Sequence, residues 1–587
     1  MRPRTLLCLC LALAFPVATR ADGPKDPLRF IPAQADVVGK IERPRALLEA
    51  IETHELVQEA FKIGGVREFY DSTNFRRLYQ LIAYFEKELG KDRNELLDAL
   101  TGGGVVIAAK IGDPAAVVLI VQSKDEKLLQ QFIRRSMALA EKELARLEVK
   151  EPIRKATYEG IETFRFGPVK GAVVDGALVL ATDDKVLHHI LDGHLGKKPI
   201  DRIADSAAFK EGRKSIPAGA HAWGWLNLEV VRELPNFKTG FEAVAQNPQF
   251  TFIFGGLVDV IKRSPYVTAS LAQEKSDWQV RVQMPRGRDG MGGISKMVVP
   301  TPPSPPSKGG DIGGVGSLPL LQPPRTFASV SYFLDLGQFW EHRAKIFNEK
   351  QVQELDKVEK ESGKFLGGVK LGTLLNQMGN HQRVVFATPE KSPYKIKPAT
   401  QIPAFAVVLD MRDPQFAKSM NFILRGVALI GSFASSSGMK MIEEEHAGCN
   451  MVCYYFPENK PFAGDPDGVR FNFNPCFVPV GDQLVMSSTV ELGKNLIDEL
   501  KRGSKEPAQP ATMRTRLYAS GAAQALRAGE EQVMTQLILT QALPPGAARE
   551  EVRKIIALVE RLGSLGFEIN YGQSDFRFDV KWQTSTK

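Results

Sequence analysis

The stretch AVVLIVQSKDEKLLQQFIRR, residues 116 to 135, joins an apolar run to an amphipathic one. Its first part has the pattern of a strand, a turn containing Asp125 follows, and the apolar positions after the turn recur at helical spacing. The stretch FAVVLDMRDPQFAKSMNFILRG, residues 405 to 426, has the same plan, and its Asp413 lies 288 positions after Asp125. This repetition predicts an internal duplication.

Other segments fit the same alignment. Gly160 and Gly448, also 288 positions apart, each precede a strand pattern with aromatic and apolar residues. GALVLATDDKVLHHILD (176 to 192) matches DQLVMSSTVELGKNLID (482 to 498), 306 positions later. SPYVTASLAQEKSDWQVRVQ (264 to 283) resembles LGSLGFEINYGQSDFRFDVKWQ (562 to 583). The order of strands, tight turns and helices predicts an α+β fold of two homologous domains, each a mostly antiparallel sheet packed with helices.

Composition predicts the domain boundaries. Residues 1–21 begin with basic residues, continue with a short apolar run and end in small residues, which is the pattern of a signal peptide. Residues 286–324 are rich in proline, glycine and serine and predict a flexible linker. The first α+β domain is expected over residues 22–285 and the second over residues 325–587. We therefore expect an exported protein, periplasmic or extracellular.

Charge and motifs exclude several classes of function. The formal net charge is +8, and loss of Arg2, Arg4 and Arg20 with the signal peptide leaves 8 − 3 = +5. Without a dense basic block, this mild charge argues against nucleic-acid binding. No second apolar run approaches the roughly 18 residues of a membrane span, so no transmembrane segment is expected in the mature chain. No phosphate-binding loop, zinc-ligand spacing or nucleophile elbow occurs, so we assign no catalytic residue, metal or cofactor.

The segment AHAWGWLNL, residues 220 to 228, contains the candidate ligand-binding residues. In an extended strand, His221, Trp223 and Trp225 share one face. Exposed tryptophans would form a platform for a sugar or peptide, whereas buried ones would belong to the core.

Three cysteines follow the signal peptide: Cys449, Cys453 and Cys476. The first two are four positions apart on a predicted strand, about 13 Å at roughly 3.3 Å per residue, which is too far for one disulfide. A disulfide between Cys476 and either of the other two cysteines is geometrically allowed. We expect Cys453 and Cys476 to lie on neighbouring strands and to oxidise after export, and free buried thiols are the alternative.

His188 and His189 raise the question of a metal or catalytic site. On a helix whose apolar residues include Leu187 and Ile190, two adjacent histidines diverge. Helical metal pairs need a spacing of three or four residues. We therefore expect both histidines to be ordinary surface residues.

The segments RFIPAQADVVGKIERP (29 to 44) and ADSAAFKEG (204 to 212), together with the repeated strand, aspartate and helix units, resemble a family of exported bacterial proteins of unknown function. The resemblance supplies no catalytic residues. Duplication without a repeated polar cluster favours a non-catalytic envelope protein that acts as a binding or structural module toward an envelope component or ligand. The alternatives are a hydrolase with a site in the cleft between the repeats, using His221 or His446, and a carrier that encloses an apolar ligand.

Overall fold

The computed structural model describes residues 25–148, 153–197, 199, 201–246, 248–291, 316–434, 438–460, 464–503 and 511–585. The predicted signal peptide (1–21) and the middle of the predicted linker (292–315) lie outside these residues. The chain divides into two compact units. The first comprises residues up to Leu234 together with Ser264–Pro285, and the second comprises Pro235–Arg263 together with Arg286–Lys587.

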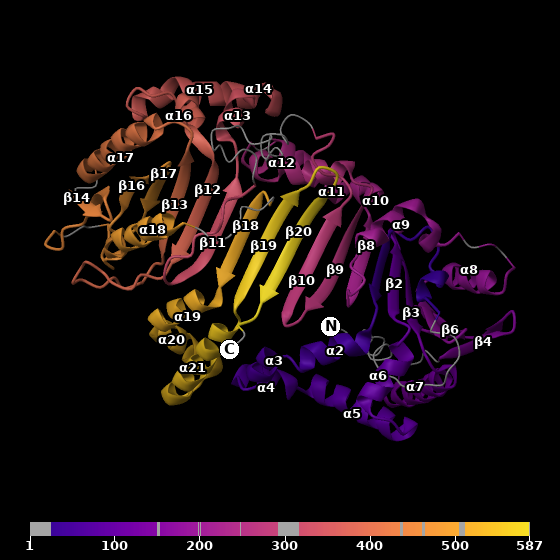
Figure 1. Cartoon of the computed structure of the whole chain (residues 1–587). Helices are drawn as coiled ribbons and strands as arrows, with labels where there is room; N and C mark the ends of the chain where they lie inside the picture. Colours follow the sequence, from indigo (N-terminus) through magenta and orange to yellow (C-terminus); the bar gives the residue numbers. More distant parts are fainter. Residues whose placement is uncertain are drawn as a thin grey trace. The chain divides into compact units, whose positions relative to one another are not determined.

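Antiparallel strands form the sheet of the first unit, in the order β4-β5-β6-β7-β3-β2-β1-β8-β9-β10 (Figure 1). Short turns join successive strands such as β4 to β7, as tight antiparallel connections require. The bounds are β1 (Val37–Ile41), β2 (Val105–Lys110), β3 (Ala116–Gln122), β4 (Arg154–Tyr158), β5 (Ile161–Phe166), β6 (Val169–Val174), β7 (Ala177–Ala181), β8 (Ala222–Asn227), β9 (Tyr266–Glu274) and β10 (Asp277–Met284).

Helices cover both faces of this sheet because its strands alternate two sets of apolar residues. On one face, Val118 and Ile120 pack with residues of α8 and α9, and on the other Val121 packs with residues of α5, α6 and α7. The helices of the first unit are η1 (Pro27–Phe30), α2 (Pro44–Glu52), α3 (Glu55–Ala60), α4 (Gly64–Tyr70), α5 (Thr73–Leu89), α6 (Arg93–Thr101), α7 (Glu126–Arg146), α8 (Asp184–His194), η2 (Ile203–Asp205), α9 (Ala207–Lys214) and α10 (Leu228–Glu233).

The sheet of the second unit has the order β14-β15-β16-β17-β13-β12-β11-β18-β19-β20, again antiparallel. Its strands are β11 (Thr326–Phe333), β12 (Met378–Ala387), β13 (Ala404–Met411), β14 (Lys440–His446), β15 (Cys449–Tyr455), β16 (Cys476–Val480), β17 (Gln483–Ser487), β18 (Met513–Tyr518), β19 (Ser564–Tyr571) and β20 (Phe576–Gln583). Its helices are α11 (Pro235–Gln246), α12 (Pro248–Arg263), α13 (Leu336–Glu341), α14 (Arg343–Ile346), α15 (Glu349–Phe365), α16 (Leu371–Gln377), α17 (Gln415–Ala434), η3 (Val469–Asn472), α18 (Val490–Arg502), α19 (Ala519–Ala528), α20 (Glu530–Gln541) and α21 (Pro545–Arg561).

The α+β class and the antiparallel pairing predicted from the sequence are confirmed. The strand order of the second unit repeats that of the first, and the registers agree as well. Ile120 pairs with Val179 between β3 and β7, and Val408 pairs with Val485 between β13 and β17. These partners are separated by 288 and 306 positions, the two spacings of the sequence alignment.

The helix that follows β3 or β13 begins in the same way in both units. The Asp125 carboxylate accepts the backbone N–H of Leu128 at 3.1 Å, and the Asp413 carboxylate accepts that of Gln415 at 2.8 Å. An aspartate in this position satisfies a backbone donor that the first helical turn leaves open.

The pair α11 and α12 lies between β8 and β9 in the chain but belongs to the second unit. The guanidinium of Arg263 at the end of α12 donates to the carbonyl oxygens of Asp289 and Gly287, each at 2.8 Å. Of the helices in the described part of the chain, none combines the length and apolar character needed to cross a bilayer.

Candidate functional site

The first unit contains an open hollow of about 410 Å³. We call it the alanine hollow, because four alanines contribute to its wall. Its lining residues are Pro32, Gln34, Ala35, Ala108, Ala109, Lys110, Ala116, Val118, Lys185, Val186 and His189.

One wall of the alanine hollow comes from the paired ends of β2 and β3. Ala108 lies opposite Val118, and Lys110 lies opposite Ala116. Alternation along each strand puts these four side chains on one face of the sheet. Since Ala108 and Val118 pack in the same cluster as Leu187, this is the face that α8 covers. Small alanine side chains leave space here that larger residues would fill.

The opposite wall comes from the first turns of α8. The Asp183 carboxylate accepts the backbone N–H of Lys185 at 2.7 Å and that of Val186 at 3.3 Å, which fixes the start of the helix. Lys185 and His189 are four positions apart and therefore project from the same side of α8. Lys110 on the strand and these two side chains surround the apolar wall.

Among the described residues, the basic side chains that line the alanine hollow form no ion pair. No carboxylate in the described part of the chain lies within ion-pair distance of Lys110, Lys185 or His189. Some other lysines of the unit are paired, as Lys124 is with Asp98 at 2.9 Å. Unpaired basic groups around an apolar wall suit a ligand with an apolar body and an anionic head.

The corresponding corner of the second unit is different. Ala387 pairs with Ala404 where Lys110 pairs with Ala116, so the strand lysine is missing. Glu491 stands 306 positions after Lys185. Its carboxylate accepts the backbone N–H groups of Glu390 at 3.1 Å and Lys391 at 3.0 Å. Glu491 in the first turn of α18 is thus hydrogen-bonded to the backbone of residues 390 and 391. Neither Lys110 nor Lys185 has a basic counterpart in the second unit.

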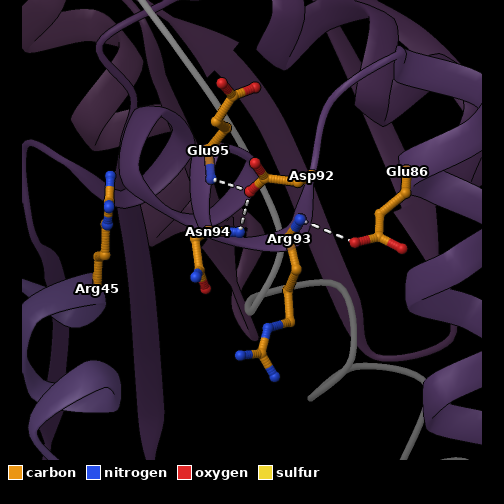
Figure 2. Close-up of a pocket in the computed structure, with 6 residues that line it drawn as sticks. All are labelled: Arg45, Glu86, Asp92, Arg93, Asn94 and Glu95. Carbon is orange, nitrogen blue, oxygen red and sulfur yellow. Dashed lines mark hydrogen bonds between the residues drawn. The ribbon is translucent and has the colours of Figure 1, made fainter. Parts of the chain in front are cut away.

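A second hollow, of about 550 Å³, has a polar lining (Figure 2). Most of its charged side chains are hydrogen-bonded, whereas the buried Asn94 Oδ1 has no partner among the described residues. The Asp92 carboxylate accepts the backbone N–H groups of Asn94 at 2.8 Å and Glu95 at 2.9 Å, and Glu86 accepts that of Arg93 at 2.8 Å. The Arg93 guanidinium binds Glu52 of α2, a residue that Figure 2 does not draw, through two contacts of 2.9 and 2.5 Å. Asp92 and Glu86 therefore cap the start of α6, and the contact between Arg93 and Glu52 links α6 to α2. The remaining lining residue is Arg45.

The candidate residues of β8 lie in different surroundings. Trp223 and Trp225 are 4% and 5% exposed and belong to the main core cluster. The Trp223 indole N–H donates to Glu42 at 2.6 Å. His221 is half-buried, and burial lowers the pKa of its imidazole, with Arg43 adding to the effect. A stacking platform requires exposed tryptophans, whereas both tryptophans of β8 are buried. Ligand binding by His221, Trp223 and Trp225 stays a prediction.

Cys453 and Cys476 lie directly opposite each other on β15 and β16. Both are buried, and in the structure both are free thiols. A hydrogen bond from Cys476 lowers the pKa of Cys453, and the same bond raises the pKa of Cys476. Directly opposed residues of an antiparallel pair have α-carbons about 4.5 to 5.5 Å apart, within the range of a disulfide.

Thiol counting tests whether this pair oxidises. We expect the unreduced protein, unfolded in denaturant so that buried thiols are accessible, to show one reactive thiol, Cys449, and three thiols after reduction. Alkylation followed by mass measurement gives both counts. Three free thiols in the unreduced protein would rule out the bridge.

His446, named for the hydrolase alternative, forms an ion pair with Asp498 at 2.9 Å. In the part of the chain that the structure describes, no serine, threonine or cysteine is hydrogen-bonded to its other ring nitrogen. The first unit has Tyr158 at the matching place, and its hydroxyl donates to Asp192 at 2.8 Å. That hydrogen bond raises the pKa of Tyr158. Because both units have this contact, we interpret it as a link between a hairpin and a helix.

The histidine pair separates as expected. The His188 ring stacks on Tyr158 with centroids 4.0 Å apart, whereas His189 lines the alanine hollow. Within the described ranges, no group of three or more histidine, cysteine, aspartate and glutamate side chains is arranged to hold a metal ion.

The alanine hollow was not predicted from the sequence. Its available signal is the run of small residues on either side of one turn, AAKIGDPAA (108 to 116). Small residues at paired strand ends leave room beside a covering helix, but the helix that forms the other wall begins almost 70 residues later. Only the folded chain joins them.

No family model matches the chain, and no curated protein matches it in sequence. Among solved structures, crystal form IV of the protein TP0453 is 11% identical, with a TM-score of 0.24 over 44% of this chain and 80% of that chain. Crystal form I of TP0453 is also 11% identical, with a TM-score of 0.24 over 46% of this chain and 83% of that chain. Likenesses this weak carry no argument about fold or function.

Proposed function

We propose that this chain is an exported, non-catalytic binding protein built from two copies of one antiparallel α+β module. The matching strand orders and registers of the two units support the duplication. The signal-peptide pattern of residues 1–21 supports export to the periplasm or the cell exterior.

In this proposal, the first unit binds a small molecule with an apolar body and an anionic head at the alanine hollow. The observation that carries the proposal is the set of three basic side chains without acidic partners around an alanine wall. Burial of the ligand's apolar surface supplies most of the binding free energy, at about 25 cal/mol per Å² of surface removed from water before the cost of association. Lys110 and Lys185 select an anionic head, and because both residues are exposed, the contribution of each is small.

Titration calorimetry with decanoate and acetate tests this site. We expect decanoate to bind and acetate not to bind, because the apolar body provides the affinity. Replacing both lysines, Lys110→Gln with Lys185→Gln, should weaken decanoate binding about tenfold or more, equivalent to about 1.4 kcal/mol. Filling the hollow with Ala116→Phe should abolish binding without removing a charge.

The matched control removes two lysines elsewhere in the same unit. Lys210 and Lys214 of α9 pair with Asp205 and Glu211 and do not line the hollow. The double variant Lys210→Gln with Lys214→Gln should bind decanoate like the original protein. An equal loss in both double variants, or no binding by the unaltered protein, would refute the site.

A further inference from the structure

Sulfur-containing side chains gather on one face of β15 and β16. The segment CNMVC, residues 449 to 453, carries sulfur at every second position, and alternate residues of a strand share a face. Cys449, Met451 and Cys453 therefore form a row that starts at the β14–β15 turn. Cys476 lies opposite Cys453 and adds a fourth sulfur to the same face.

Three of these sulfur groups are buried together beneath α18. Met451 and Cys453 are both 0% exposed, and Cys476 is 3% exposed. Cys453 and Cys476 lie opposite each other, and the Cys476 thiol donates to the Thr489 carbonyl oxygen at 3.7 Å. Figure 1 shows α18 beside β16 and β17, and residues of this helix pack in the same core cluster as the three side chains.

Gly493 lets α18 approach these sulfur groups closely. A β-carbon at this position would lie 2.5 Å from the Cys476 Sγ and 3.2 Å from the Met451 methyl carbon. No side chain of residue 493 therefore separates the helix from the sulfur groups. Cys476 and Met451 therefore both lie against residue 493, and Cys453 lies opposite Cys476 on the neighbouring strand.

The first unit shows that the fold does not require sulfur here. Its corresponding hairpin pairs Tyr158 with Ile161 where the second unit pairs His446 with Cys449. By the same register, Thr163 and Arg165 stand at the positions of Met451 and Cys453. The pair Arg165 and Lys170 replaces the pair Cys453 and Cys476. The sulfur cluster is therefore specific to the second unit.

The composition of the cluster decides which metal it suits. Soft thiolate and thioether ligands select monovalent copper. Structural zinc sites use four nitrogen, oxygen or thiolate ligands, and iron–sulfur clusters usually use four cysteines, so neither matches two thiols and a thioether. We propose that Cys453, Cys476 and Met451 form a buried binding site for Cu(I). On binding, each thiol releases its proton to solvent, and two copper–thiolate bonds form without a change in oxidation state.

This proposal does not depend on the alanine hollow. It also predicts that the disulfide prevents copper binding, because the oxidised cysteine pair has no thiolate that could bind the metal. Reduced protein should bind Cu(I), and protein with the Cys453–Cys476 bridge should not. Cys449 is half-buried at the turn end of the row and lies outside the three-ligand set.

The experiment titrates the reduced mature chain with Cu(I) under anaerobic conditions, with bicinchoninate as the competing chelator. We expect one tightly bound Cu(I) per chain and X-ray absorption showing sulfur neighbours only. Cys453→Ser and Cys476→Ser should each weaken binding about 100-fold or more, because removing a ligand costs at least as much as the tenfold to hundredfold cost of disturbing its surroundings. Met451→Leu should weaken binding about tenfold while preserving volume in the core.

Two controls keep the assignment specific. Cys449→Ser retains both proposed thiolates, and Met441→Leu removes a methionine that is 48% exposed on β14, so both should bind Cu(I) like the unaltered chain. Thermal unfolding of each variant distinguishes loss of a ligand from loss of the fold. Absence of competition with bicinchoninate would overturn the proposal. Unchanged affinity in folded Cys453→Ser or Met451→Leu, or equally tight binding of Zn(II), would overturn it too.

Discussion

Replacing Trp223 with alanine should lower the free energy of unfolding of the first unit by about 3 to 5 kcal/mol. The indole is 4% exposed, lies 6.0 Å from the Phe209 ring between centroids, and has the Arg213 guanidinium 4.2 Å above it. The substitution would leave a cavity and would also remove the donor that now binds Glu42 at 2.6 Å. Urea unfolding of the variant measures the loss.

His221→Ala is the matched control, since His221 is half-buried on the same strand. We expect it to cost clearly less than Trp223→Ala. This comparison separates a core residue from a ligand-binding residue. Preserved stability in Trp223→Ala would show that the core role assigned to the indole is wrong.

The second large effect concerns one helix position in each unit. Ile190 of α8 and Leu496 of α18 are both 0% exposed and are 306 positions apart. Ile190→Ala and Leu496→Ala should each cost about 2 to 5 kcal/mol, because each helix covers its own sheet with this residue. Calorimetric unfolding should show that both variants are destabilised.

Leu539→Ala provides the baseline for this pair. Leu539 is 75% exposed on α20, and substitution of such a residue should change stability by no more than about 0.5 kcal/mol. A small loss in either Ile190→Ala or Leu496→Ala would mean that the two helices do not cover their sheets in the same way.

Hydrophobic spacing was sufficient to predict the α+β class and the antiparallel strands. Apolar runs such as residues 116–122 became strands, and Asp125 and Asp413 stand where the following helices begin. These features are local, because alternation and capping depend on residues close together in the chain. The register between β3 and β7 does not follow from this pattern alone, because both faces of the sheet are covered and a slip of one residue would exchange two apolar sets of side chains.

The surroundings of each side chain were harder to predict. Alternation placed Trp223 and Trp225 on one face of β8, but it does not say which face a distant segment covers. Phe209 and Arg213, both on α9, cover Trp223 in the structure. The alanine hollow escaped prediction for the same reason, because α8 forms one of its walls.

The helical pair formed by α11 and α12 shows a further limit. Its sequence lies inside the predicted first domain, yet these residues belong to the second compact unit. Arg263 binds backbone carbonyls of residues 287 and 289 there. Periodicity predicts that such segments are helical, but it carries no information about which unit they join.

The two candidate sites use the common scaffold in different ways. Lys110 and Lys185 of the first unit correspond to Ala387 and Glu491 of the second. The sulfur cluster of the second unit corresponds to ordinary polar and aliphatic side chains in the first. A repeated scaffold with unrepeated reactive groups is what we expect when function diverges after duplication.

Paired-cysteine cross-linking tests the shared strand plan most directly. Leu119 lies opposite Leu180 on β3 and β7, and Val407 lies opposite Met486 on β13 and β17. In a chain whose three native cysteines are replaced by alanine, Leu119→Cys with Leu180→Cys and Val407→Cys with Met486→Cys should both form disulfides on mild oxidation. Partners shifted by one residue, such as Leu119→Cys with Val179→Cys, should keep free thiols, because neighbouring side chains point to opposite faces. Free thiols in either opposed pair, or a disulfide in the shifted pair, would contradict the account that both units share one strand order and register.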